Sequence, residues 1–154
     1  MSDIVILEDD GVQQCALREA LEHRFYDRNL RMFSTEVGFI ENLEHFSRQP
    51  PALFLLDSMV THAYPVAGDD PRLILETHPI RDKATAGIRC LRRIRAIPSL
   101  GSVPSVLFTV LTIPDLRSAG VVDPEHEIEG LGAIFLPKID SLDPVVDIVE
   151  EILT

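Results

Sequence analysis

The sequence has no tryptophan, only two cysteines among 154 residues, and no long hydrophobic run. Cys15 and Cys90 are too few for a disulfide framework, so we interpret both as reduced thiols that serve as packing groups. No apolar run approaches the roughly 20 residues that cross a bilayer. The first ten residues, MSDIVILEDD, lack the basic start of a signal peptide. We therefore expect a cytoplasmic protein without membrane insertion.

Basic residues are also scarce. Fourteen Lys and Arg stand against 25 Asp and Glu, a formal net charge of −11, whereas a protein that grips the nucleic-acid backbone needs a basic surface. The one basic cluster is IRCLRRIR at 88–95, and it fits the solvated face of a helix better than a phosphate-binding patch. We expect no direct contact with nucleic acid.

What is present is a chain of one domain's size, with 45% hydrophobic and 25% charged residues, typical of globular proteins. Continuous apolar runs predict five buried strands. The predicted strands are residues 3–7, 30–35, 52–56, 103–109 and 131–137. Strands and helices alternate, which is typical of a doubly wound α/β fold with a five-stranded parallel sheet.

Helical spacing of apolar residues predicts the elements between the strands. The predicted helices are residues 12–25, 36–47 and 87–97, with a last helix capped by Asp143 and carrying Pro144 at its first position. In the first helix the predicted inner face is Val12, Cys15, Ala16, Ala20 and Leu21. In the last helix it is Val145, Ile148, Val149 and Ile152. Prolines and glycines in residues 110–130 predict one short or irregular helix at most.

The longest stretch without a regular pattern is residues 60–86, which hold three prolines. Loops between a strand and a helix usually have about 2–6 residues, and longer ones are often functional. Its two histidines, His62 and His78, fit no compact metal-ligand motif, so we interpret them as solvated. We hypothesise that this insertion is a lid or a partner-docking segment.

Polar side chains follow the predicted strands in a chemically coherent set. In doubly wound sheets, ligands bind at the carboxyl ends of the strands. The strand-end residues are Glu8, Asp9 and Asp10, then Asp57, Thr109 and Lys138. Asp10 is alternatively the N-cap of the first helix.

Converging carboxylates repel one another, which either raises their pKa values or demands a cation. Oxygen ligands without nearby His or Cys favour Mg²⁺, or Mn²⁺, over Zn²⁺. An aspartate is a known nucleophile towards phosphorus, and Lys138 and Thr109 supply a charge and a hydrogen-bond donor for phosphoryl oxygens. The residues therefore predict a site that forms an aspartyl phosphate on Asp57.

In the order of these motifs the chain resembles the receiver domains of two-component response regulators, over nearly its whole length. The matching positions are the acidic pair Glu8 and Asp9, the phosphoacceptor Asp57, the helix GIRCLRRIR from Gly87, Pro104, the switch residues Thr109 and Phe135, and Lys138. The resemblance implies the flavodoxin-like receiver fold. It also implies a single receiver domain over 1–154, with an insertion at about 60–86 and no effector domain.

The resemblance further implies a role for each residue of the metal site. Asp9 and Asp57 would bind Mg²⁺ directly, together with the backbone carbonyl of Met59, and Glu8 would act partly through water.

A second set of residues would carry the switch. Lys138 and Thr109 would contact the phosphoryl oxygens, and inward movement of Thr109 would let Phe135 change rotamer. The donor would be a phosphohistidine on a sensor histidine kinase or a histidine phosphotransfer protein, and the output would pass to an unknown downstream protein.

Two departures from the family pattern keep an alternative open. Val110 replaces a small residue after the switch threonine and crowds the phosphoryl entrance. The proline that normally follows the lysine instead precedes it, as Pro137, and Ile139 follows, which threatens to displace the ammonium group. The alternative is a pseudo-receiver, an interaction module that works without phosphorylation.

A phosphatase of the haloacid-dehalogenase type is disfavoured, because it needs a second aspartate two residues after the nucleophile, where Met59 stands. We expect no turnover of a separate substrate.

Overall fold

Five parallel strands form one sheet in the order β2-β1-β3-β4-β5 in the computed structural model, which describes residues 2–63 and 83–154. The strands are β1 (Ile4–Leu7), β2 (Leu30–Phe33), β3 (Leu53–Leu56), β4 (Ser105–Thr109) and β5 (Ala133–Pro137). All neighbouring strands pair in parallel. This confirms the predicted doubly wound α/β fold. Most of the predicted insertion, including His78, lies outside the described residues.

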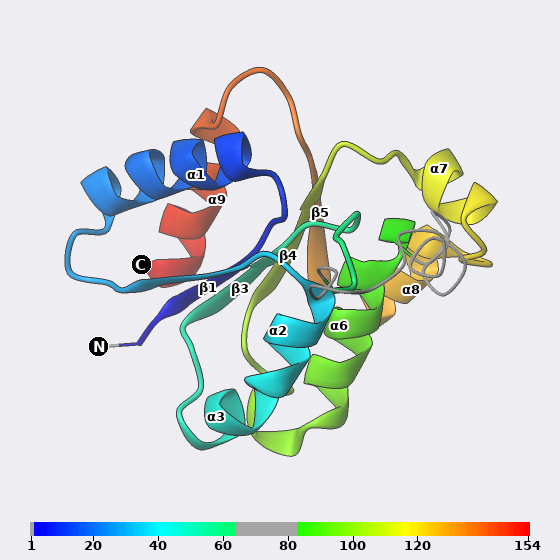
Figure 1. The fold of residues 1–154 in the computed structure, drawn as a ribbon, viewed down its shortest axis with the longest axis horizontal. Helices are drawn as coiled ribbons and strands as arrows, with labels where there is room; N and C mark the ends of the chain where they lie inside the picture. Colours follow the sequence, from blue (N-terminus) through cyan, green and yellow to red (C-terminus); the bar gives the residue numbers. More distant parts are fainter. Residues whose placement is uncertain (1, 64–82) are drawn as a thin grey trace, which may run out of the picture.

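Helices cover both faces of the sheet (Figure 1). They are α1 (Gly11–Arg24), α2 (Glu36–Glu41), α3 (Leu43–Arg48), α6 (Ala86–Ala96), a short 3₁₀ helix (Pro98–Leu100), α7 (Ile113–Ser118), α8 (Pro124–Gly130) and α9 (Asp143–Leu153). α1 and α9 lie on one face, and α2, α3 and α6 lie on the other. In the described part of the chain, no helix combines the length and apolar character needed to span a bilayer.

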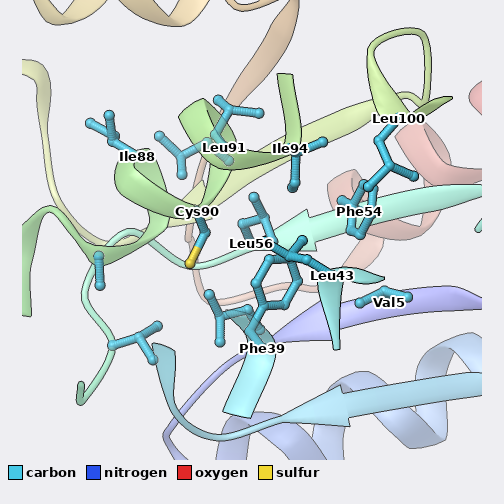
Figure 2. Packing of buried hydrophobic residues seen from close by; sticks show 14 of the residues in the cluster. Val5, Phe39, Leu43, Phe54, Leu56, Ile88, Cys90, Leu91, Ile94 and Leu100 are labelled. Carbon is cyan, nitrogen blue, oxygen red and sulfur yellow. The ribbon is translucent and has the colours of Figure 1, made fainter. Parts of the chain in front are cut away.

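Alternate residues of each buried strand enter different cores, because successive side chains of a strand point to opposite faces. In β1, Ile4 and Ile6 pack towards α1 and α9, whereas Val5 and Leu7 pack towards α2 and α6. Figure 2 shows the second core, where Val5, Leu56 and Phe39 lie beneath the side chains of α6. Burial on both faces explains why these strands are continuous apolar runs.

Two predicted helical regions differ from the observed ones. The predicted helix 36–47 is two helices, α2 and α3, separated at Asn42, whose side-chain amide donates to the Gly38 carbonyl at 2.8 Å. The prediction of at most one helix in 110–130 is wrong, because α7 and α8 both form. Their prolines lie in the first helical turn, where a missing N–H costs nothing, and Thr112 and Asp123 cap them.

The predicted inner face of the first helix is also partly wrong. Leu17 and Leu21 are its buried residues, whereas Val12 and Cys15 are exposed. Cys15 is therefore not a packing group, although Cys90 is buried. The first turn instead presents Gln14 inward, where its amide donates to the Ser34 hydroxyl at 3.0 Å and to the Glu8 carbonyl.

The predicted cap of the last helix is wrong by one position, because the N-cap of α9 is Leu142 and not Asp143. Asp143 lies inside the first turn of α9 and makes no capping hydrogen bond with its side chain. Its N–H is instead accepted by the Ser141 hydroxyl at 3.1 Å. The predicted inner face holds, with Val145 and Val149 buried.

The arginines of α6 are only in part a solvated face. Arg92 and Arg93 are exposed. Arg89 instead pairs with the buried carboxylate of Glu36, 2.9 Å from its Nε. Arg95 donates to three backbone carbonyls that close the turn after α6 and the end of α8.

His62 also departs from its prediction as a solvated loop residue. Its Nδ1 lies 2.6 Å from Glu36 Oε1, so the ring is tied to the start of α2.

Candidate functional site

The parallel register brings the ends of β1 and β3 together at one edge of the sheet. Leu7 of β1 is the register partner of Leu56 of β3, so the residues that follow, Glu8 and Asp57, leave the sheet side by side. The ladder continues for one more bond, from the Asp57 N–H to the Leu7 carbonyl at 2.9 Å. The strand order changes direction at β1 and β3, the point at which doubly wound sheets bind ligands.

Three carboxylates and one ammonium group meet at this edge. Glu8, Asp9 and Asp57 each place a carboxylate oxygen within 4.8 Å of the others. Lys138 Nζ lies 2.6 Å from Glu8 Oε2 and 2.9 Å from Asp57 Oδ2. Glu8, Asp57 and Lys138 are each more than nine-tenths buried as side chains. The convergence expected from the strand ends is thus present in the structure.

Burial and crowding change the proton affinities of this cluster. Burial, and then the charge of Asp57, raises the pKa of Glu8 to about 7, against the opposing effect of Lys138. Burial by itself would lower the pKa of Lys138, but the charge of Asp57 and the hydrogen bonds to both carboxylates outweigh it and raise that pKa. Lys138 therefore stays protonated, and its ammonium group is shared between Glu8 and Asp57.

Asp9 is held by a different set of groups. The N–H and the hydroxyl of Thr61 both donate to Asp9 Oδ2 at 2.9 Å. The Lys83 ammonium lies 3.6 Å from the same oxygen. Sequence reasoning missed Thr61 and Lys83, because both lie in the irregular stretch 60–86 and no periodicity or motif marks them.

The backbone around Asp57 is tightly packed. The Met59 N–H donates to Asp57 Oδ1 at 3.2 Å, and the Gly87 N–H donates to the Ser58 carbonyl at 3.0 Å. A Cβ on Gly87 would lie 2.1 Å from the Asp57 carbonyl oxygen, so only glycine fits where α6 crosses this loop. Asp10 is the N-cap of α1, bonded to the N–H groups of the first turn.

The remaining predicted residues lie near this edge without joining the cluster. Thr109 is fully buried at the end of β4, and its hydroxyl accepts from the Leu111 N–H at 3.2 Å. Phe135 points into a separate hollow of about 350 Å³ between α7, α8 and β5. The structure places no bond between either side chain and the three carboxylates in the described part of the chain.

The departures from the family pattern have different consequences. Pro137 before Lys138 does not displace the ammonium group, which reaches both Glu8 and Asp57. The backbone of Lys138 also stays in the sheet, because its N–H donates to the Thr109 carbonyl at 2.9 Å. Val110 and Ile139, which follow β4 and β5, are both more than half exposed.

The chemistry of the three carboxylates fits a hard divalent cation. The group contains oxygen donors and no His or Cys, the set that Mg²⁺ and Mn²⁺ prefer. When all three carboxylates are ionised, Lys138 on Glu8 and Asp57 and Lys83 on Asp9 leave the site with a net negative charge. A divalent ion at the acidic cluster would relieve this repulsion.

Comparison with solved structures places this fold among receiver domains. The signal receiver domain of a DNA-binding response regulator from Colwellia psychrerythraea 34H superposes with a TM-score of 0.66 at 19% identity, covering 99% of this chain and 98% of that chain. The phosphorylated cyanobacterial phytochrome response regulator RcpA gives a TM-score of 0.61 at 18% identity, covering 98% and 90%.

A third similar structure holds a metal ion. It is the receiver domain of a sensor histidine kinase from Pseudomonas aeruginosa PAO1, with magnesium coordinated in its active site cleft. It superposes with a TM-score of 0.59 at 17% identity, covering 99% of this chain and 97% of that chain. No protein-family model matches the chain, and no curated protein matches it. The likeness therefore establishes the receiver fold, and the site residues carry the functional inference.

Proposed function

We propose that this chain, which has the receiver fold, is a receiver in a two-component phosphorelay and accepts a phosphoryl group on Asp57. The single observation that carries the proposal is the ammonium group of Lys138, shared between Asp57 and Glu8 at 2.9 and 2.6 Å beside Asp9. A buried aspartate, further acids and a lysine at one sheet edge are the groups that phosphoryl transfer requires.

In the proposed reaction, a carboxylate oxygen of Asp57 attacks the phosphorus of a phosphohistidine. The bond from phosphorus to the imidazole nitrogen breaks, and the histidine leaves with the electron pair. Lys138 neutralises the transferred oxygens, since its ammonium group already lies on Asp57. Attack of water on the same phosphorus later releases phosphate and restores the carboxylate, so no separate substrate is turned over.

Mg²⁺, with Mn²⁺ as a substitute, would be held by Asp9, Asp57 and the backbone carbonyl of Met59, with Glu8 acting partly through water. When bound, the ion would neutralise the carboxylates and the phosphoryl oxygens. Burial, and then the charge of Asp57, raises the pKa of Glu8 in the absence of a cation.

The proposed switch begins at Thr109. Its hydroxyl would leave the Leu111 N–H and bond a phosphoryl oxygen, which would free space for Phe135 to change rotamer. Phe135 already borders a hollow between β5 and α8, so its movement would reshape that face. The partners would be a sensor histidine kinase or a histidine phosphotransfer protein, and an unknown downstream protein.

The test is incubation with a small phosphodonor such as acetyl phosphate, with and without Mg²⁺. We expect the intact protein to gain the mass of one phosphoryl group, labile to hydroxylamine. The gain should be absent in Asp57→Asn and absent when EDTA removes the metal. A protein that stays unmodified in Mg²⁺ would overturn the proposal.

The alternative of a pseudo-receiver is favoured by one observation, the exposed Val110 directly after Thr109. In that case the fold would serve as an interaction module and the mass would not change. Val110→Ala separates the two readings, because a gain of labelling in this variant alone would show that the valine blocks the donor.

A further inference from the structure

Only two of the 154 residues are lysines, Lys83 and Lys138. The other twelve basic residues are arginines. Both lysine ammonium groups lie on carboxylates of the same acidic cluster, although the two lysines are 55 positions apart in the chain. Lys138 contacts Glu8 and Asp57, and Lys83 contacts Asp9.

The two lysines differ in how firmly they are held. Lys138 is nearly buried and donates two hydrogen bonds of 2.6 and 2.9 Å. Lys83 keeps 42% of its side chain exposed and approaches Asp9 only to 3.6 Å. Lys138 is therefore a permanent part of the site, whereas Lys83 can leave at small cost, since exposed ion pairs are weak.

In the described part of the chain, the contacts on Asp9 gather on one of its two carboxylate oxygens. Thr61 donates its N–H and its hydroxyl to Oδ2, and Lys83 faces that same atom. Within residues 2–63 and 83–154, no donor is bonded to Oδ1. Thr61 thus holds the Asp9 carboxylate by two hydrogen bonds to one oxygen, and an oxygen of this carboxylate lies within 4.8 Å of oxygens of Glu8 and Asp57.

Thr61 is itself fixed by the backbone on both sides. The Glu36 N–H donates to the Thr61 carbonyl at 2.9 Å, and the Val37 N–H donates to the His62 carbonyl at 2.9 Å. The Val60 N–H donates to the carbonyl of Lys83 at 3.2 Å, which holds the lysine backbone beside this segment. The two residues that contact Asp9 are therefore joined in one hydrogen-bonded unit.

We propose that Lys83 is an exchangeable internal counter-ion that competes with a divalent cation for Asp9, and that Thr61 is a positioning residue for the Asp9 carboxylate. The inference rests on the divalent-cation site of the proposed function. Without the cation, Lys83 offsets the charge of Asp9. With the cation bound, the Lys83 ammonium group would move into solvent, while Thr61 would keep its two hydrogen bonds to Asp9.

The two residues should therefore change cation affinity in opposite directions. Lys83→Gln removes the competitor and should tighten binding of Mg²⁺ by about two- to fivefold, as expected for an ion pair whose cation is exposed. Thr61→Val keeps the N–H and the shape but loses the hydroxyl, and should weaken binding by about tenfold, as for other groups that orient a metal ligand. Isothermal titration calorimetry of each purified protein with MgCl₂ measures both changes in Mg²⁺ affinity.

Two matched variants control for general effects. Arg93→Gln removes one positive charge from an exposed position of α6, away from Asp9, and should leave Mg²⁺ affinity nearly unchanged. Thr112→Val removes a capping hydroxyl from α7, so it should lower stability without changing the affinity.

The outcomes distinguish the inference from the proposed function. If the parent binds Mg²⁺ and Lys83→Gln binds it no more tightly, the counter-ion role is overturned and the metal site stands. The same holds if Arg93→Gln gains as much Mg²⁺ affinity as Lys83→Gln. An unchanged affinity in Thr61→Val overturns the positioning role. Binding by Lys83→Gln but not by the parent supports the competition strongly. No Mg²⁺ binding by any variant overturns the metal-dependent function and this inference together.

Discussion

Replacing Gly87 by alanine would drive a methyl group into the backbone that carries the proposed phosphoacceptor. A Cβ at this position would lie 2.1 Å from the Asp57 carbonyl oxygen, and 2.8 Å from both the Asp57 carbonyl carbon and the Ser58 Cα. All three are backbone atoms, so no side chain can turn aside. Helix α6 and the loop after β3 must instead move apart by about 1 Å, at the point where the Gly87 N–H bonds the Ser58 carbonyl.

The magnitude follows from two opposing terms. Overpacking of a tight site costs about 1–3 kcal/mol, and more where backbone must move. Alanine is favoured over glycine inside a helix by about 1 kcal/mol. We therefore expect the free energy of unfolding to fall by up to roughly 2 kcal/mol, which lowers Tm by up to roughly 8 °C for a domain of this size. Because Asp57 moves with its carbonyl, labelling by acetyl phosphate should slow by on the order of a hundredfold.

Thermal unfolding by circular dichroism and the rate of phosphoryl labelling measure the two effects. Gly130→Ala is the matched control, since a Cβ there meets nothing within 4 Å at the end of α8. It should leave labelling unchanged and stability unchanged or slightly higher. If Gly87→Ala unfolded and reacted as Gly130→Ala does, the reasoning from close backbone contact would be refuted.

Three further predictions follow from buried groups. In EDTA, stability should fall as the pH rises from about 5 to about 7, because folded Glu8 keeps its proton to a pKa of about 7 whereas the unfolded chain releases it near 4.5. Glu8→Gln should remove that part of the slope in urea titrations, and an unchanged slope would contradict the assignment. A thiol reagent should label Cys15 but not Cys90 in the native protein, because burial shields Cys90 and raises its pKa. Two labelled thiols before unfolding would refute this burial. Arg89→Met should cost about 2 kcal/mol in urea unfolding, because it strips a cation from the buried carboxylate of α2, whereas Arg93→Met at an exposed position should stay within about 0.5 kcal/mol. Equal costs would show that the ion pair adds nothing.

The strand-end acids show what local pattern predicts well. Each buried strand is a short apolar run, and its end is marked by the first charged residue, as Leu7 is followed by Glu8 and Leu56 by Asp57. Parallel strands in one sheet bring all their carboxyl ends to the same edge. To predict that Glu8, Asp57 and Lys138 lie close together, it was therefore enough to place each of them at the end of a parallel strand.

The inner face of α1 shows where local pattern fails. Helical spacing selected Val12 and Cys15, yet the helix buries Leu17 and Leu21 and turns Gln14 inward. The spacing was compatible with more than one stripe. The direction in which α1 crosses the sheet decided between them, and that direction depends on packing against α9 and β2 rather than on the helix alone.

The charged residues find their partners far away in the sequence, beyond the reach of any local pattern. Glu36 binds His62 and Arg89, and Asp9 binds Thr61 and Lys83, across 26 to 74 positions of the chain.

By itself the sequence determined how many strands form and where each lies along the chain, because apolar periodicity is a property of neighbouring residues. The ends of these strands in turn mark the edge of the sheet at which the acids gather. The tertiary structure alone decided the further partners of the acids, such as Thr61 and Lys83 on Asp9 and Arg89 on Glu36. Coulombic and hydrogen-bonding partners are set by distance in space, and the stretch after β3 returns to Asp9 by a path that no local pattern encodes.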